Sequence, residues 1–580
     1  MVYAKFISVL LLCVPVVFYA QKHDNIWLFG GDGGDQTPAT DSGGVTMLDF
    51  SEIDRPKILN LQSPKVWFYG TNASICDSVG NLLFYTNGEH VYRYNHQKMP
   101  PSTALVDNGT GQGYRIPQGA ITLPFPDHSG QYVVISTEFR YMNGTVSGWK
   151  LFSHTVDMLQ NNGLGKLTQV RHLLVQDTFS LGMITATKHA NGRDWWFVVP
   201  KSKSNIYYIG LLSPNGIKID TFNSCLSIKD GFGQATFTPD GSKYIRAEDD
   251  DLLTPNQVSI LDFDRCEGKL NNCQTKFLGL NTFGTGSVVS ANSKYLYVMD
   301  TYRCLQYDLQ SQDVFSTELL VEIWDSSRYY IWPTDFYLSQ LAPDGRIYIN
   351  TTNGSTSMHY INFPNRLGPA CQFVQNGILT PTLIQYEMPN FSNFRLGPID
   401  GSPCDTLGLD NHPLANFRWE QEDSTELLHI TFTDLSAYEP ETWHWTFGDG
   451  SESQDTSPVH TYAQPDVYEV CLVVRNQNSA DTICRAVNVG VSSTNDDQAA
   501  PFEVVAYPNP FSDRLILQLK GLDYLRGEVD LFDVAGQLVS TKMWNGRQLD
   551  WYLGHLVPGV YFYRARTDRG VLKTGKIVKM

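Results

Sequence analysis

Short hydrophobic runs alternate with turn residues through most of the chain. Examples are residues 82–85 (LLFY), 132–135 (YVVI), 195–199 (WWFVV) and 295–298 (YLYV), all rich in aromatic and β-branched side chains. Such runs, bounded by Gly, Asn, Asp and Ser, are typical of buried β-strands, whereas long helical periodicities are few. The pattern therefore predicts an all-β protein.

The turns in the N-terminal two-thirds of the chain recur at a regular distance. The second residue of each turn falls at position 80, 130, 192, 241, 293 or 345, a spacing of about 50 residues. This period is typical of four-stranded β-propeller blades, whose radial packing buries both faces of every sheet. With a further unit at 25–50, the sequence predicts a seven-bladed β-propeller over residues 24–402. Residues 378–400 are expected to complete the first blade and close the ring.

Two of these turns carry a more specific signal. Residues 238–241 read TPDG and residues 342–345 read APDG. They resemble the turns of WD40-like and lactonase-like propellers. The resemblance covers the repeat unit only, and it transfers no active site, because propellers host unrelated functions.

Residues 414–490 read as a separate small β-sandwich. Its three blocks are WHWTFGDG at 443–450, PVHTY at 458–462 and VYEVCLVV at 467–474. Their order and spacing resemble a PKD domain, an immunoglobulin-like fold. The resemblance implies an extracellular spacer or adhesive unit. Asp449 is expected to cap its own turn, and the rival interpretation is a calcium ligand.

Residues 502–580 read as a second small immunoglobulin-like sandwich. Its blocks are YPNPF at 507–511, LFDVAGQLV at 531–539, GVYFY at 559–563 and GKIVK at 575–579. They resemble the type A C-terminal sorting domain of proteins exported by the type IX secretion system of Gram-negative bacteria. The resemblance implies that the secretion machinery is a partner through 502–580, and that the protein is extracellular or on the outer-membrane surface.

The N-terminus agrees with export. Lys5 precedes an apolar run at 6–18, which is too short for a bilayer span. We interpret residues 1–20 as a signal peptide cut between Ala20 and Gln21. No other segment is long and apolar enough to predict a transmembrane anchor, and residues 491–501 read as a linker.

The charge is acidic and unevenly distributed. The formal net charge is −17, yet residues 502–580 contain 11 Lys and Arg against 8 Asp and Glu. The remainder of the chain is therefore strongly acidic. Nucleic acid and anionic membranes both require a basic face, so neither is an expected partner.

Cysteines are expected to form disulfides in an exported protein. Nine remain once Cys13 leaves with the signal peptide, so at least one is unpaired, and Cys76 is the candidate. The expected pairs are Cys471 with Cys484, Cys266 with Cys273, and Cys371 with Cys404. A zinc site is the rival interpretation, but no C-x-x-C spacing occurs.

An acidic run offers one candidate metal site. Asp249, Asp250 and Asp251 follow one another, and clustered carboxylates suit Ca²⁺. The rival interpretation is a solvated loop. The sequence requires no cofactor, and calcium is the one ion it suggests.

Aromatic residues offer a candidate ligand site. Tyr329, Tyr330 and Trp332 lie close together in a connection between two blades, where aromatic rings can stack on sugars. Packing in the core is the rival interpretation for such residues.

Catalytic signatures are weak. No G-x-S-x-G or H-E-x-x-H motif occurs, and the histidines are scattered. The leading hypothesis is therefore a secreted or surface-displayed binding or adhesion protein that recognises an extracellular polysaccharide or a surface protein. The alternatives are a hydrolase or lyase acting in the propeller channel, and a structural part of a surface or gliding apparatus.

Overall fold

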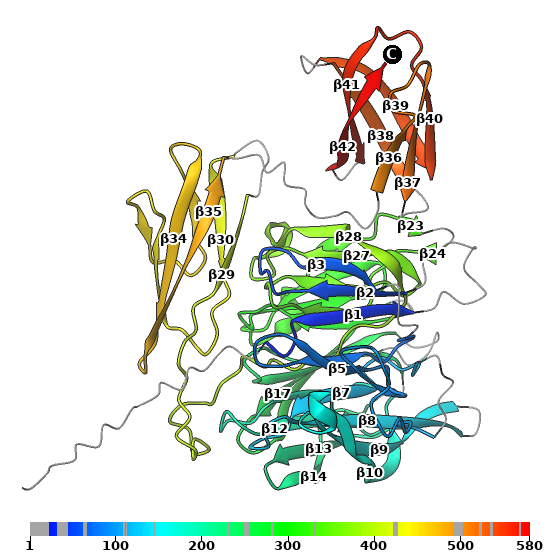
Figure 1. Cartoon of the computed structure of the whole chain (residues 1–580). Coiled ribbons are helices and arrows are strands. Elements are labelled where there is room, and N and C mark those ends of the chain that lie inside the picture. The colour runs from blue at the N-terminus through cyan, green and yellow to red at the C-terminus, as the bar shows by residue number, and fades with distance from the viewer. Residues whose placement is uncertain are drawn as a thin grey trace, which may run out of the picture.

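The computed structural model describes residues 22–31, 44–61, 66–107, 111, 113–142, 145–228, 231–248, 255–279, 284–329, 332–421, 427–490, 503–520, 525–533, 537–567 and 570–580. Within them the chain is all-β, as predicted, apart from three short 3-10 turns: η1 (Asn161–Gly163), η2 (Val314–Thr317) and η3 (Gly368–Cys371). The strands form an N-terminal region followed by two small modules (Figure 1).

The N-terminal region contains seven described sheets of three or four antiparallel strands, in which strand order follows the chain. The first three sheets are β1 (Ile26–Gly31), β2 (Gly44–Asp49), β3 (Lys57–Leu61); β4 (Ala73–Cys76), β5 (Leu82–Thr86), β6 (Val91–Arg93); and β7 (Ala120–Pro124), β8 (Gln131–Met142), β9 (Thr145–Asp157), β10 (Lys166–Phe179). The next two are β11 (Thr185–Lys188), β12 (Trp195–Pro200), β13 (Ile206–Ser213), β14 (Gly216–Asn223); and β15 (Gly233–Phe237), β16 (Lys243–Glu248), β17 (Gln257–Asp264), β18 (Lys269–Phe277). The last two are β19 (Gly286–Val289), β20 (Tyr295–Met299), β21 (Arg303–Asp308), β22 (Leu319–Ile323); and β25 (Ser339–Leu341), β26 (Ile347–Ile349), β27 (Ser355–Ile361), β28 (Phe373–Ile384). A hairpin of β23 (Arg328–Tyr329) and β24 (Trp332–Pro333) lies between them in the chain.

Burial along the strands shows how these sheets pack. Every residue of β1, β4, β12 and β20 is buried, which requires cover on both faces of the sheet. The last strands, such as β14, expose many of their side chains. The repeated turns follow from backbone geometry, because Gly241 and Gly345 have φ of +71° and +78°, where an L side chain is strained.

Successive sheets touch through their first strands. β1 contacts β4, β4 contacts β7, β11 contacts β15, β15 contacts β19, and β19 contacts β25. The last sheet returns to the first, because β28 contacts β1, β2 and β3. At this junction the hydroxyl oxygens of Thr46 and Thr382 lie 2.6 Å apart.

The expectation that residues 378–400 complete the first blade is wrong. Strand β28 pairs with β27 as the outer strand of the last sheet, and the first sheet has three strands among the described residues. The strand meets the first sheet by side-chain packing and the Thr46–Thr382 contact rather than by a shared ladder.

Residues 385–397 then run through the middle of the N-terminal region, and we call them the axial segment. The side-chain amide of Asn390 donates hydrogen bonds to the carbonyls of Ala120 and Ile184, at 2.9 and 2.8 Å, which belong to or flank the first strands of two sheets. Phe394 is completely buried. The axial segment therefore fills the centre of the sheets with its own side chains.

The middle module is a pair of sheets around one core. Its strands are β29 (Phe417–Glu420), β30 (His429–Asp434) and β33 (Val459–Thr461), facing β31 (Thr442–Thr446), β32 (Glu452–Ser453), β34 (Asp466–Arg475) and β35 (Ala480–Val489). Trp445 and Phe447 are buried in this core together with Leu472, as their alternation predicts. The side chain of Asp449 accepts a hydrogen bond from the N–H of Ser451 at 3.0 Å, the expected turn cap.

The C-terminal module has the same two-sheet form. One sheet holds β36 (Glu503–Tyr507), β37 (Arg514–Lys520) and β40 (Gln548–Tyr552), and the other holds β38 (Leu525–Phe532), β39 (Leu538–Gly546), β41 (Gly559–Thr567) and β42 (Gly570–Lys579). Trp544 and Trp551 lie in the shared core.

Three disulfides link the described cysteines. Cys471 is bonded to Cys484, the pair expected from the hairpin. The other two expected pairs are wrong: Cys266 is bonded to Cys404, and Cys273 to Cys225. Sequence distance misled here, because Cys266 and Cys404 are 138 residues apart yet meet in the fold. Cys371 is free and buried, as are Cys76 and Cys304.

Among the residues that the structure describes, no helix has the length and hydrophobicity needed to cross a bilayer.

Candidate functional site

The middle module is docked on the N-terminal region through a buried ion network. Arg346 donates to Asp344 at 2.9 Å and to Glu420 at 3.3 Å. Arg418 also pairs with Glu420 and donates to the carbonyl of Asn362 at 2.6 Å. Because Arg346 is 6% exposed and Arg418 is fully buried, both guanidinium groups depend on these partners. These contacts join the two parts through buried charged groups.

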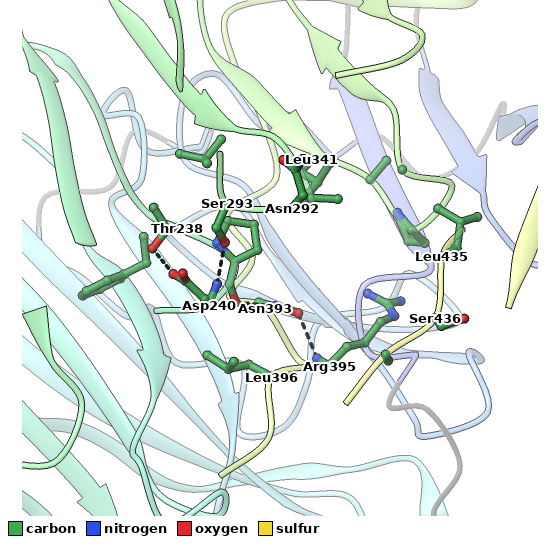
Figure 2. A pocket seen from close by; sticks show the side chains of 18 of the residues that line it. Thr238, Asp240, Asn292, Ser293, Leu341, Asn393, Arg395, Leu396, Leu435 and Ser436 are labelled. Atoms are coloured by element: carbon green, nitrogen blue, oxygen red, sulfur yellow. Dashed lines mark hydrogen bonds between the residues drawn. The ribbon is translucent and has the colours of Figure 1, made fainter. Parts of the chain in front are cut away.

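A cavity of about 830 Å³ lies between the two parts. On the N-terminal side it is lined by the turns at 238–240, 291–293 and 342–345 and by residues 391–397 of the axial segment. On the other side it is lined by residues 434–440, together with Trp443, Thr456 and Ser457. Figure 2 shows side chains from these walls facing a common space. The repeated turns are thus brought together at one end of the sheets.

Most charged groups of this cavity are already paired. Both guanidinium nitrogens of Arg395 donate to the carboxylate of Asp24 at 2.7 Å. Burial alone lowers the pKa of Arg395, but Asp24 outweighs it and the net shift is upward. One carboxylate oxygen of Asp240 accepts a hydrogen bond from the hydroxyl of Thr238 (Figure 2) and another from the N–H of Ser242.

One carboxyl group in the cavity wall titrates closer to neutrality. Burial raises the pKa of Asp434 to about 6, against the hydrogen bonds that it accepts from the N–H and hydroxyl of Ser436. This carboxyl group is the cavity's candidate for interaction with a ligand amine or hydroxyl.

Hydroxyl and carboxyl groups are the reactive side chains of this cavity. No His or Cys occurs among the described residues that line it, so its hydroxyl groups have no imidazole base. Three histidines among the described residues are buried elsewhere: His23 near the start of the described chain, His154 in β9 and His359 in β27. Burial lowers the pKa of His154 to about 3, and its ring nitrogens meet Ser136 and the N–H of Arg171. The arrangement suits binding by hydrogen bonds.

The second candidate site consists of exposed aromatic residues on the β23–β24 hairpin and at the base of the connection that carries it. Trp332, on β24, is 50% exposed, and Tyr329 pairs with it across the hairpin. Tyr302 is 46% exposed, and its ring stacks on Trp324 with centroids 5.5 Å apart and planes at 29°. Tyr330 lies outside the described residues.

The backbone fixes this surface at its base. The N–H of Trp324 donates to the carbonyl of Tyr302 at 2.9 Å, and the N–H of Phe336 donates to the carbonyl of Thr301 at 2.8 Å. Both ends of the connection that carries the hairpin are therefore anchored on neighbouring residues. Sequence reasoning found Trp332 but missed Tyr302 and Trp324, because nothing in the local pattern shows that they stack.

The predicted calcium ligands Asp249, Asp250 and Asp251 lie outside the described residues, as do Ala20 and Gln21 at the predicted signal-peptide cut.

Elsewhere, Asp400, Asp405 and Asp410 bring one carboxylate oxygen each within 4.8 Å of the others. Asp400 accepts hydrogen bonds from the N–H of Asn411 and from the side chain of Asn478, at 2.8 Å for the latter. These bonds attach the connection between the two parts to a turn of the middle module.

Two family models match the chain. Residues 411–491 match the PKD domain, and residues 505–580 match the secretion system C-terminal sorting domain. The C-terminal module is a sorting domain. It indicates export by the type IX secretion system to the extracellular space or the cell surface.

Solved structures give only distant likenesses. The PKD1 domain of the Vibrio cholerae metalloprotease PrtV is 25% identical, with 13% of this chain and 95% of that chain covered and a TM-score of 0.12. A protein of unknown function from Desulfotomaculum acetoxidans is 13% identical over 59% of this chain and 96% of that chain, with a TM-score of 0.31. The periplasmic gluconolactonase PpgL of Pseudomonas aeruginosa is 12% identical over 68% and 98%, with a TM-score of 0.23. No curated protein matches the sequence.

Proposed function

We propose that this protein is an exported binding protein whose N-terminal region is a seven-bladed β-propeller displayed at the cell surface. Three observations support the propeller: the spacing of about 50 residues between turns, the contacts between successive first strands, and the return of β28 to the first sheet. In such a ring each sheet covers the apolar faces of its neighbours, which accounts for the complete burial of β1, β4, β12 and β20.

The filled centre is the observation that carries a binding role. A catalytic propeller would present ionisable side chains to a substrate along the axis. Here the axial segment occupies that space, and Asn390 and Phe394 use their side chains to hold the sheets together. Ligands therefore meet the outer surfaces of the propeller or the cavity beside the PKD domain.

The aromatic surface of Tyr302, Trp324 and Trp332 is the proposed contact for an extracellular polysaccharide. Sugar rings have apolar C–H faces that pack on aromatic rings. Trp332 is exposed on the hairpin, and Tyr302 is exposed where one end of the connection that carries the hairpin is anchored. An anchored platform loses little conformational entropy when a ligand binds.

The full-length exported protein, screened on glycan arrays and on insoluble polysaccharides, tests this function. We expect retention on at least one polysaccharide. Trp332→Ala and Tyr302→Ala are each expected to weaken binding at least tenfold, about 1.4 kcal/mol, in line with the contribution of a stacked aromatic ring.

The matched control is Tyr94→Ala, which removes an aromatic ring that is 49% exposed elsewhere in the N-terminal region. It is expected to leave binding unchanged. Absence of retention on every polysaccharide would refute the proposed ligand, and equal losses in all three variants would refute the proposed surface.

A further inference from the structure

Two of the three free cysteines in the described chain lie in the same hydrophobic cluster. Cys304 and Cys371 are both completely buried and pack with Tyr297 and Met299. Cys76 belongs to a different cluster. The free thiols thus divide into one close pair and one isolated residue.

The strand register places Cys304 on a defined face of its sheet. In the β20–β21 ladder Met299 is opposite Cys304, and Tyr297 is opposite Gln306. Residues two apart on a strand share a face, so Cys304 and Gln306 point to the same side as Met299 and Tyr297.

The segment that ends at Cys371 packs on this same face. The side chain of Gln306 donates to the carbonyl of Arg366 at 2.9 Å and accepts from the N–H of Gly368 at 2.8 Å. η3 begins at Gly368 and ends at Cys371, and it contacts β22, the strand next to β21.

Tyr297 connects the two thiols. Its hydroxyl group donates to the carbonyl of Pro364 at 2.9 Å and is also a hydrogen-bond partner of the Cys371 side chain. Burial raises the pKa of Tyr297, and the neighbouring thiols Cys371 and Cys304 raise it further. Cys371 is therefore a hydrogen-bond partner of a tyrosine that shares a hydrophobic cluster with Cys304.

We propose that Cys304 and Cys371 are joined by a fourth disulfide in the exported protein. The three other disulfides show which oxidation state this chain takes, and a fourth pair leaves Cys76 as the single odd thiol of the nine. The bond would link β21 to the segment that leads into β28, and so join two neighbouring sheets.

The reaction is thiol–disulfide exchange with a disulfide-bearing oxidant, either a thiol oxidoreductase or oxidised glutathione. The thiolate of one cysteine attacks a sulfur of the oxidant and releases one thiol from it. The second cysteine then displaces the remaining oxidant sulfur, so the oxidant leaves as two thiols. Two electrons pass to the oxidant, and the protons of the two cysteines end on its thiols.

Because both thiols are buried in the folded protein, the stage of folding decides when they can react. Burial raises the pKa of Cys371 to about 11 and that of Cys304 well above its usual value, so little thiolate exists in the folded protein near neutrality. Exchange therefore takes place while the segment ending at Cys371 is still open.

Peptide mapping of the full-length exported protein tests the proposal. The protein is unfolded without reductant, alkylated, digested and analysed by mass spectrometry. We expect a peptide containing Cys304 cross-linked to one containing Cys371, and alkylation at Cys76 but not at those two positions. Alkylation of both Cys304 and Cys371 would overturn the proposal, as would a bond from either to another cysteine.

Single substitutions give an independent thiol count. Cys304→Ser is expected to free one additional thiol, which maps to Cys371, and to lower Tm by several degrees. Cys76→Ser, at an equally buried cysteine, is the matched control and is expected to free none. If Cys304→Ser fails to fold, the wild-type peptide map alone decides the outcome.

Discussion

At the scale of single residues, Glu387 has the most unusual environment in the axial segment. Its carboxyl group is fully buried and accepts hydrogen bonds from the N–H of Gly30 at 2.6 Å and of Gln385 at 3.0 Å. Burial raises the pKa of Glu387 to about 8, although these hydrogen bonds oppose the rise. The carboxyl group therefore remains protonated at neutral pH and holds the axial segment against β1.

This pKa predicts how stability depends on pH. An unfolded chain releases the proton near the ordinary value of 4.5, whereas the folded protein holds it up to about pH 8. The folded state binds more protons between these values, so stability falls as pH rises from 4.5 to 8, by a few kcal/mol. Glu387→Gln is expected to flatten this fall, as measured by Tm across the range.

Glu469→Gln, at an exposed glutamate of the PKD domain, is the control and is expected to keep the wild-type profile. A Glu387→Gln profile that parallels wild type would show that the carboxyl group ionises normally in the folded protein.

At the scale of elements, the turn after β31 depends on one carboxylate. Asp449 accepts hydrogen bonds from the N–H of Ser451 at 3.0 Å and from the ring of His460 at 2.7 Å. Burial raises its pKa, but the donors from Ser451 and His460 lower it more, to about 2. The turn is thus stabilised by the ionised form of the side chain.

Asp449→Ala is expected to destabilise the PKD domain by about 1–2 kcal/mol, since an ionised, partly exposed hydrogen-bond acceptor is lost. A depressed pKa contributes stability that is complete above the ordinary value of 3.8 and is lost as pH falls through 2. The difference from wild type should therefore disappear near pH 2. Amide hydrogen exchange of β31 and β32 measures this difference in stability between Asp449→Ala and wild type. A difference that persists unchanged at pH 2 would contradict the carboxylate's role.

The same scale shows what the sequence could predict. The sequence predicts turns such as 238–241 and 342–345 from their Pro, Asp and Gly residues. Glycine is required at Gly241 and Gly345 because the backbone φ is positive there. The axial segment has no such signal. Its residues do not alternate, and Asn390 resembles a loop residue until its amide is seen to bond to carbonyls from two sheets. Sequence patterns identify regular strands, and they do not separate a buried irregular segment from an exposed one.

At the scale of the whole molecule, the arrangement of the parts was the least predictable feature. The two modules were evident from local motifs, but the cavity depends on how the PKD domain docks (Figure 1). That docking joins Arg346 to Glu420 and Asn362 to Arg418, from separate parts of the chain. Nothing in a local pattern distinguishes such an arginine from a solvated one. Among the exposed aromatic residues, the sequence pointed to Trp332 but not to Tyr302 and Trp324. These two residues are far apart in the chain, and their rings meet only in the fold.

The docking itself is open to a direct test, because Glu420 is the shared partner of two buried cations. Glu420→Ala leaves Arg346 and Arg418 buried without that carboxylate, a change that typically costs about 3–5 kcal/mol. Releasing the PKD domain from the N-terminal region would expose both guanidinium groups to water and relieve this cost. The Cys266–Cys404 disulfide would still hold the start of the connection on the N-terminal region, and the polypeptide after Cys404 would keep the domain attached while it moves. Small-angle X-ray scattering of the full chain is therefore expected to show a larger radius of gyration for Glu420→Ala than for wild type.

The control is Glu452→Ala, which removes an exposed carboxylate of the same domain, 3.8 Å from His444, and should leave the scattering unchanged. An unchanged curve for Glu420→Ala would mean that the remaining contacts, such as Arg418 with the Asn362 carbonyl and Asn478 with Asp400, hold the domain in place without Glu420.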